Sequence, residues 1–242
     1  PPNNHTSFST TMSAATDATK QQIELVQPAL DKKRDEIIGG IPKEALDVLF
    51  AQTADVAKSQ LAEKSLPVGA KLPAFELPDA TGATVSSAKL LAEGPLVVVF
   101  YRGGWCPYCN IHLRSLAKAL PAFKAAGAAN IVAIAPETPD KVATSAEAAE
   151  LNFPALSDVG QKFARSLGIV FELPKEVQEI YTQFGFSVAE FNGSGDEWAL
   201  PLPAAFVVAA DGTVAYKYAQ ADYSQRVEPK AILEGLATLK KQ

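Results

Sequence analysis

A short apolar run that leads into a pair of cysteines is the feature that most constrains the fold of this chain. Residues 96–101 are Leu-Val-Val-Val-Phe-Tyr, and Gly103-Gly104 follow almost at once. An apolar run of this length that ends at glycines predicts a buried strand that breaks into a turn. Because residues 111–124 have the pattern of a helix, Cys106-Pro107-Tyr108-Cys109 is expected at a strand-to-helix junction.

The two cysteines of this junction are predicted to be a redox pair, and the chain has no others. Backbone N–H groups and the helix dipole favour a thiolate at a helix start, so an exposed Cys106 sulfur is the expected nucleophile. A spacing of three brings Cys109 onto the same helix face, facing inward, as the resolving thiol. A structural disulfide gains most by closing a long loop, and this pair would close a very short one.

Zinc binding at this pair is the alternative that we considered and rejected. A structural zinc site needs four ligands, usually Cys or His. The chain has two histidines, His5 in a polar stretch and His112 one helical turn from Cys109, and no fourth ligand is evident. We expect no bound metal and no prosthetic cofactor, and we expect His112 to lie on the helix surface rather than to act as a base.

Composition excludes several classes of function. A net charge of −5 leaves no basic footprint for nucleic acid, and no apolar run is long enough to cross a membrane. The first twenty residues are polar and lack the apolar core of a signal peptide. Because no cysteine is left over for stabilisation, we expect a reducing compartment, the cytoplasm or an organelle.

The pattern along the chain divides it into three parts. Residues 1–18 are polar and are predicted to be a disordered tail. Residues 19–66 are predicted to form a helical hairpin, which packs on the main domain or on a partner subunit. In residues 67–242, strands and helices alternate and a hairpin closes the sheet, which predicts an α/β fold with helices on both faces of a mixed sheet. Strands are expected at 75–77, 84–85, 96–101, 130–135, 153–157, 204–209 and 214–218, and helices at 106–126, from 138, at 158–167 and from 229.

The segment 168–200 is less regular and rich in aromatic side chains. We expect it to be an excursion that packs on the core or forms a dimer, and the alternative is a lid or pocket wall for an organic substrate. Its aromatic residues are Phe171, Tyr181, Phe184, Phe186, Phe191 and Trp198.

The stretch from Tyr101 to Asn110, Tyr-Arg-Gly-Gly-Trp-Cys-Pro-Tyr-Cys-Asn, resembles the peroxiredoxin-like branch of the AhpC/TSA family. Residues 68–75, 153–158, 203–212 and 222–229 are also similar to segments of this branch. The resemblance implies a thioredoxin-like, peroxiredoxin-type fold and a thiol-dependent redox enzyme. It also implies that an external thiol such as thioredoxin, glutaredoxin or glutathione acts as the reductant.

Some positions depart from the family's pattern. Typical peroxiredoxins have a proline and a Thr or Ser before the reactive cysteine, where this chain has Val99 and Gly103. The family's arginine near the late strand is replaced around Pro203. A CxxC motif with a proline at the head of a late strand is the thioredoxin arrangement, in which that proline is cis, and Pro203 is the candidate for it here.

With a peroxide as substrate, the Cys106 thiolate attacks the O–O bond and becomes a sulfenic acid, and Cys109 condenses with it to a disulfide. The departing oxygen anion needs hydrogen-bond donors. The candidates are Arg102, Arg226 and the amides of Gly103 and Gly104.

The neighbouring side chains each have two interpretations at this point. Arg102 is an active-site donor or a solvated surface charge, and Arg226 is a donor or a cap near the last helix. Trp105 shields the thiol from water or belongs to the core. Tyr108, expected to be exposed, forms a docking surface or tunes the disulfide.

The motif alone does not choose between two reactions. With a disulfide as substrate, Cys106 attacks sulfur, Cys109 releases the mixed disulfide, and Pro203 positions the substrate backbone. We predict a peroxidase for hydrogen peroxide or organic hydroperoxides, with a thioredoxin- or glutaredoxin-like protein disulfide reductase as the alternative. The expected partners are the peroxide or disulfide substrate, a thiol reductant protein or glutathione, and a second copy in a homodimer.

Overall fold

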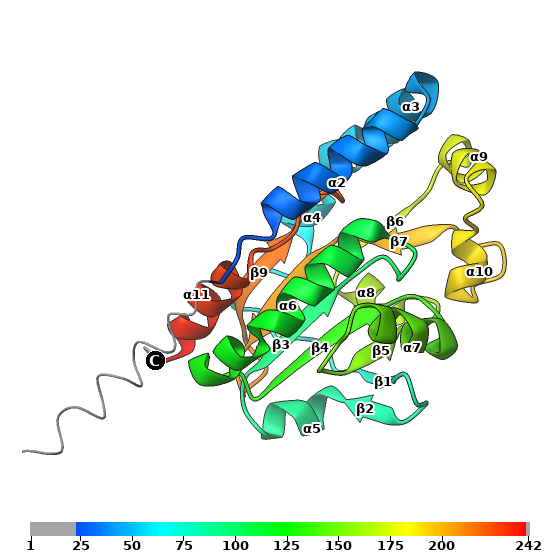
Figure 1. The fold of residues 1–242 in the computed structure, drawn as a ribbon. Coiled ribbons are helices and arrows are strands. Elements are labelled where there is room, and N and C mark those ends of the chain that lie inside the picture. Colours follow the sequence, from blue (N-terminus) through cyan, green and yellow to red (C-terminus); the bar gives the residue numbers. More distant parts are fainter. Residues whose placement is uncertain (1–22, 241–242) are drawn as a thin grey trace, which may run out of the picture.

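A five-stranded mixed sheet organises this structure, a computed structural model that describes residues 23–240 (Figure 1). The disorder predicted for residues 1–18 therefore falls outside the described residues. The strands lie in the order β5 (Ala155–Ser157), β4 (Asn130–Ala135), β3 (Leu96–Phe100), β8 (Ala204–Val208) and β9 (Val214–Ala219).

The central strand β3 is buried along its whole length. It pairs in parallel with β4 and antiparallel with β8. A strand covered on both faces is expected to be a continuous apolar run, which is what residues 96–100 are. The predicted α/β class, a mixed sheet flanked by helices, is confirmed.

Alternate side chains of β3 point to opposite faces of the sheet. Val97, Val99 and Tyr101 join one core with the inner side of α6 (Pro107–Ala126) and with α11 (Pro229–Leu239). Leu96, Val98 and Phe100 join the other core, which includes α8 (Lys162–Ser166). Tyr101 and the start of α6 thus lie on the same face, so the cysteine pair belongs to the first of these cores.

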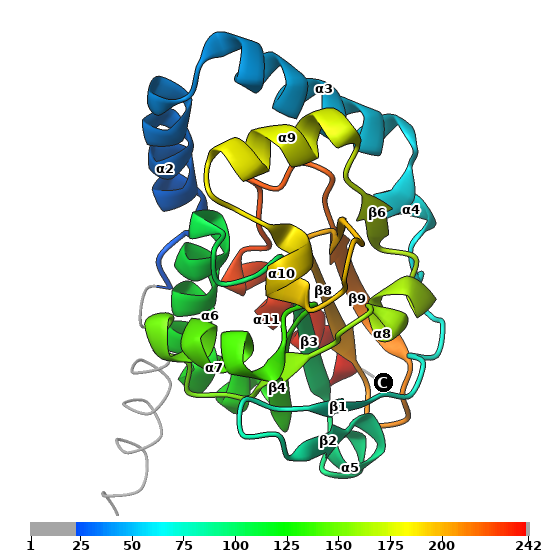
Figure 2. The same cartoon turned by 90° about the vertical axis from the view of Figure 1, so that its right-hand side faces the viewer.

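Helices α2 (Gln27–Gly40) and α3 (Lys43–Lys58) come before the sheet in the sequence, and both pack on the rest of the chain. Figure 2 shows α2 beside α6 and α3 lying across α9 (Lys175–Gln183). The start of α2 is anchored because the amides of Val26 and Gln27 donate to the Glu228 carboxylate at 2.8 and 2.9 Å.

The segment that seemed irregular in sequence has its own order. Strand β6 (Val170–Glu172) pairs antiparallel with β7 (Ala199–Pro201), and α9 and α10 (Val188–Asn192) lie between them. Side chains of α3, α9, α10 and β7 form a third cluster, which includes Trp105 at its edge. The excursion therefore packs on the core, and it does so next to the cysteine motif.

The remaining elements are short or peripheral. Among residues 23–240 no helix is both long and apolar enough to cross a membrane. The strands predicted at 75–77 and 84–85 are present as β1 (Glu76–Pro78) and β2 (Thr84–Ser86), which pair antiparallel. The other peripheral elements are α4 (Leu61–Lys64), α5 (Ser87–Ala92) and α7 (Pro139–Ala148).

Candidate active site

The cysteine pair lies where β3 ends and α6 begins, as predicted. Cys106 is the N-cap residue of α6, with extended φ and ψ of −89° and 112°, and Pro107 occupies the first helical position. Proline suits that position because its missing N–H has no partner there in any helix. The Cys109 amide donates to the Cys106 carbonyl at 3.0 Å, which places the second sulfur one turn further on. Both cysteines are free thiols.

The prediction of an exposed Cys106 sulfur is wrong. Cys106 is 1% exposed and Cys109 is fully buried. The helix start does not face solvent because the turn before α11 closes over it with Tyr223 and Arg226. A reagent therefore reaches the sulfur only when this cover moves.

Arg226 approaches both sulfurs from the far end of the chain. Its Nη2 is 3.2 Å from Cys109 Sγ and 4.0 Å from Cys106 Sγ. Its Nη1 donates to the backbone carbonyls of Tyr223 and Gln225, which fixes the guanidinium plane. The interpretation of Arg226 as a mere cap of the last helix is therefore wrong.

Arg102 is a second buried cation beside the pair. Its guanidinium carbon lies 4.3 Å from the centre of the Tyr223 ring and 5.0 Å from that of Trp105. Its Nη2 donates to the Tyr181 hydroxyl, and its backbone N–H donates to Cys109 Sγ at 3.4 Å. The interpretation of Arg102 as a solvated charge is wrong, because three aromatic rings cover it.

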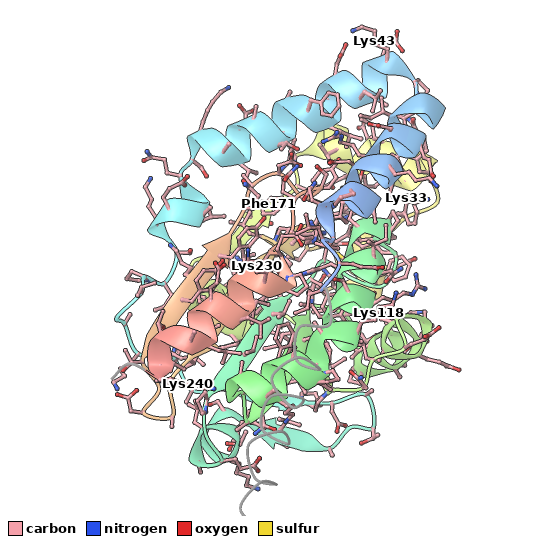
Figure 3. All side chains as sticks on the ribbon, turned by 60° about the vertical axis from the view of Figure 1, so that its left-hand side comes forward. Lys33, Lys43, Lys118, Phe171, Lys230 and Lys240 are labelled. Atoms are coloured by element: carbon pink, nitrogen blue, oxygen red, sulfur yellow. The ribbon has the colours of Figure 1, made fainter. Side chains whose placement is uncertain are left out.

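Neither arginine forms an ion pair with a carboxylate in residues 23–240. Arg102 is 2% exposed and Arg226 is 4% exposed, so both charges are also shielded from water. Lysines, by contrast, lie on the outer faces of the helices, among them Lys43, Lys118 and Lys230 (Figure 3). A buried cation without a carboxylate strongly favours an anion beside it. The ionisable groups that Arg226 Nη2 contacts are the two thiols, whereas Arg102 Nη2 contacts the Tyr181 hydroxyl.

The negative charge of the reduced pair rests on Cys109. Burial raises the pKa of Cys106, and the neighbouring Cys109 sulfur raises it further. Burial also opposes ionisation of Cys109, but the hydrogen bond from Cys106, the charge of Arg226 and the Arg102 N–H together hold the pKa of Cys109 well below its usual value. The sequence placed the thiolate on Cys106; the structure differs because the donors converge on the deeper sulfur.

The loop between β3 and α6 has room only for glycine. At Gly103, where φ is +147°, a Cβ would lie 2.4 Å from Trp105 Nε1, and at Gly104 a Cβ would lie 2.0 Å from Ser145 Oγ. The Gly104 amide donates to Glu137 Oε1 at 3.0 Å. Gly104 is therefore not free to bind an oxygen anion as predicted, because its N–H already has a carboxylate partner.

Trp105 and Tyr108 are both part of the cover over the pair. The Trp105 ring is half-buried and packs against Tyr181 and Phe186, each with ring centres 5.9 Å away. Tyr108 is buried against Tyr223, with ring centres 5.9 Å apart. The prediction that Tyr108 is exposed and forms a docking surface is therefore wrong. The first turn of α6 places residue 108 under the turn before α11, and this burial cannot be read from the motif.

Pro203 does not have the predicted cis bond, since every peptide bond in residues 23–240 is trans. The chain is held extended on both sides: the Leu202 amide donates to the Ile169 carbonyl at 2.8 Å, and the Gln220 amide donates to the Pro203 carbonyl at 3.1 Å. A trans bond continues this ladder into β8, and without a tight turn the trans form is favoured by about 0.5–1 kcal/mol.

The sequence placed one buried neighbour of the pair wrongly and did not reveal another. His112 was expected on the surface but is buried, with Nε2 3.1 Å from the Val227 carbonyl. Burial and the charge of Arg226 lower the pKa of His112 to about 3, so the neutral ring donates and anchors the turn that carries Arg226. Glu137 follows β4, and burial raises its pKa to about 7. Its position after a strand parallel to β3 was the available signal, because parallel strands end at one edge of a sheet.

No group of three or more His, Cys, Asp or Glu side chains in residues 23–240 is arranged to hold a metal ion. The polar atoms around the cysteines come instead from arginine, tyrosine and backbone amides. The site is therefore a thiol pair in a positively charged, aromatic enclosure.

Comparison with solved structures shows the same fold. The structure of peroxidoxin BcpB from Mycobacterium tuberculosis superposes with a TM-score of 0.56 at 23% identity, over 73% of this chain and 97% of that one. Reduced Prx3 from Vibrio vulnificus, solved in complex with hydrogen peroxide, superposes with a TM-score of 0.56 at 20% identity, over 71% of this chain and 99% of that one. The predicted thioredoxin-like, peroxiredoxin-type fold is confirmed.

Sequence comparison agrees with this result. A Mycobacterium tuberculosis protein named "putative peroxiredoxin" is 38% identical over 103 residues, which are 43% of this chain and 64% of that protein. Chloroplastic peroxiredoxin Q of Populus jackii is 33% identical over 101 residues, 42% of this chain and 46% of that protein. The matched stretch thus spans less than two thirds of these relatives. The model of the AhpC/TSA family matches residues 68–217, more than half of the chain, and the resemblance seen in the sequence is thereby confirmed: the chain belongs to the AhpC/TSA family.

Proposed function

We propose that the protein is a thiol-dependent peroxidase that reduces hydrogen peroxide or organic hydroperoxides through Cys106 and Cys109. The observation that carries this proposal is the thiol–thiolate pair beside a buried arginine, with Arg226 Nη2 at 3.2 and 4.0 Å from the two sulfurs. The names of the relatives, which are peroxiredoxins, support the same reaction.

The first half-reaction transfers one oxygen atom to Cys106. The Cys109 thiolate accepts the Cys106 proton across the hydrogen bond between them, and the Cys106 thiolate attacks one oxygen of the peroxide. An S–O bond forms, the O–O bond breaks, and the leaving oxygen takes up a proton and departs as alcohol or water. Cys106 is the nucleophile because it caps α6 at the helix start, whereas Cys109 lies one turn deeper.

The second half-reaction closes the disulfide. The Cys109 sulfur attacks the sulfenic sulfur of Cys106, the S–S bond forms, and the hydroxyl leaves as water after gaining a proton. An external thiol, thioredoxin, glutaredoxin or glutathione, then returns two electrons. We expect this cycle to run in a reducing compartment, the cytoplasm or an organelle.

The arginines stabilise the charge that develops on the leaving oxygen. Arg226 and Arg102 take the place of the hydroxyl and the late-strand arginine that typical peroxiredoxins carry. Because both are desolvated, each donor is worth more than it would be in water. The rings of Trp105, Tyr108 and Tyr223 line the approach to the pair and suit the apolar part of an organic hydroperoxide.

The disulfide-reductase alternative is disfavoured. The relatives that match this chain in sequence are named peroxiredoxins rather than disulfide reductases. Pro203 also lacks the cis bond on which that interpretation depended. We further infer that residues 67–242 form the catalytic domain with residues 19–66 as an appendage, and that the chain acts as a homodimer.

Stopped-flow mixing of the reduced protein with hydrogen peroxide and with cumene hydroperoxide tests the proposal. Oxyanion donors that are already in place beside the pair predict a rate constant on the order of 10³ times that of free cysteine. Cys106→Ser is expected to abolish the fast phase, and Cys109→Ser is expected to stop at a sulfenic acid that mass spectrometry detects. A parent rate no higher than that of free cysteine would refute the function.

A further inference from the structure

A buried carboxyl group, Glu137, lies directly beneath the loop that carries the thiols. Its Oε1 accepts from the Gly104 amide at 3.0 Å and its Oε2 accepts from Ser145 Oγ at 2.9 Å. Its own carbonyl accepts from Ser157 Oγ. No Lys or Arg in the described part of the chain forms an ion pair with it, so nothing cationic neutralises its charge at close range.

The carboxyl group is connected to the helix start through a short series of contacts. A Cβ at Gly103 would lie 2.9 Å from Glu137 Oε1, so the loop rests on the carboxyl without a gap. The Cys106 amide donates to the Gly103 carbonyl at 3.1 Å, and Asn110 Nδ2 donates to the Gly104 carbonyl at 2.8 Å. A change of charge at Glu137 therefore acts, through these contacts, on the first turn of α6.

The ionisable groups that face Glu137 come from three elements. The charge of Glu137 raises the pKa of Tyr101, which lies at the end of β3. The charge of Cys109, on α6, raises the pKa of Glu137 in the same way, because neighbouring anions oppose each other's ionisation. Lys141, on α7, is the one nearby cation that favours the carboxylate. Two negative charges, one on Glu137 and one on Cys109, would repel each other in a desolvated site.

We propose that Glu137 is a positioning residue of the thiol site that takes up a proton when the cysteine pair is reduced and gives it up when the pair is oxidised. The inference rests on the redox pair of the proposed function. Its proton balance is closed: ROOH needs two electrons and two protons to become ROH and water, and a thiol–thiolate pair that closes to a disulfide supplies both electrons but only one proton. The Glu137 carboxyl group holds the second.

The acidity of Glu137 supports this assignment. Burial raises its pKa to about 7, the Ser145 and Gly104 hydrogen bonds oppose the rise, and the Cys109 charge adds to it. When the disulfide forms, the Cys109 charge disappears and the pKa of Glu137 falls. The carboxyl group therefore releases its proton in the same step that consumes one.

Infrared difference spectroscopy of the full chain tests this, with diamide as oxidant and dithiothreitol as reductant. The carbonyl band of protonated Glu137 is expected to titrate near pH 7 in the reduced protein, and its midpoint is expected to move down by about 0.5 in pH on oxidation. Glu137→Gln assigns the band by removing it. Asp158→Asn is the matched control, because Asp158 is also a buried carboxyl with a raised pKa, but it caps α8 and no cysteine shifts it.

Equal midpoints in the two redox states, or a Glu137 that ionises below pH 5, would overturn the inference. If Glu137→Gln does not fold, ¹³C NMR of the parent with labelled glutamate carboxyls follows the same titration. Because diamide forms the disulfide without peroxide, a negative result here is distinct from a failure of the peroxidase kinetics.

Discussion

The guanidinium group of Arg226 joins the turn before the last helix to both sulfurs, and the acidity of the pair depends on it. Cys109 lies 117 residues earlier in the sequence. The motif predicted the thiols, the helix start and Pro107, because these follow from local spacing. Arg226 was predicted as a candidate donor, whereas nothing in the motif placed Tyr223, Tyr181 or Glu137 at the site, because their position there depends on the tertiary fold.

Replacement of Arg226 by Gln is expected to raise the pKa of Cys109 by about 1–3, since an opposite charge at this distance depresses a pKa by that amount. The thiolate absorbance at 240 nm measures the midpoint. The depressed pKa of Cys109 also adds stability that is present at neutral pH and is lost as the pH falls through the folded value. The reduced parent should therefore lose this stability on acidification through that window, and Arg226→Gln should lose a smaller contribution at a higher pH.

Arg165→Gln is the control for this experiment, because Arg165 pairs on the surface with Glu172 and Glu197. It should leave the thiolate titration unchanged. A midpoint in Arg226→Gln equal to that of the parent would show that the guanidinium does not set the acidity of the pair.

At the scale of elements, the junction of β3 and α6 is specified by local sequence and the segment between β6 and β7 is not. The strands β3, β4 and β8 are continuous apolar runs, so their prediction needed no tertiary information. The helices α9 and α10 are stabilised by α3 and by the Trp105 ring. The burial that stabilises them comes from residues far away in sequence, and a local pattern cannot contain it.

The tight fit of the loop predicts that Gly104→Ala destabilises the protein by about 1–3 kcal/mol, because the added Cβ overlaps Ser145. Urea unfolding measures the change. Gly39→Ala is the matched control, since a Cβ there meets nothing within 4 Å and alanine is the better helix residue within α2. Equal free energies of unfolding for the parent and Gly104→Ala would show that the loop accommodates the added Cβ at no cost in stability.

At the scale of the whole molecule, distant segments assemble one cover over the thiols. Three segments meet at this place. Tyr181 of the segment between β6 and β7 and Tyr223 of the turn before α11 both cover Arg102 of the motif. Arg226 of the same turn contacts the sulfurs. The sequence predicted the sheet and its order of elements but an open helix start. Closure comes from α9 and from the turn before α11, which pack over the start of α6.

This closure predicts that alkylation of the reduced protein is slow. Iodoacetamide is expected to alkylate Cys106 at least about 10-fold more slowly than a CPYC peptide, because reaction needs local opening of the cover. Mass spectrometry after timed quenching measures the alkylation, with the unfolded protein in urea as the control. Equal alkylation of the folded and unfolded chains would contradict a closed site.

The bridge from the Glu228 carboxylate to the amides of Val26 and Gln27 has a consequence for how the protein is made. A polypeptide emerging from the ribosome exposes its cysteines long before residues 226 and 228 exist. Until then the nascent thiols have the acidity of ordinary cysteine and no shield. Reactivity is therefore acquired only after residues 226–228 have been made and the turn that carries them has closed on the start of α2.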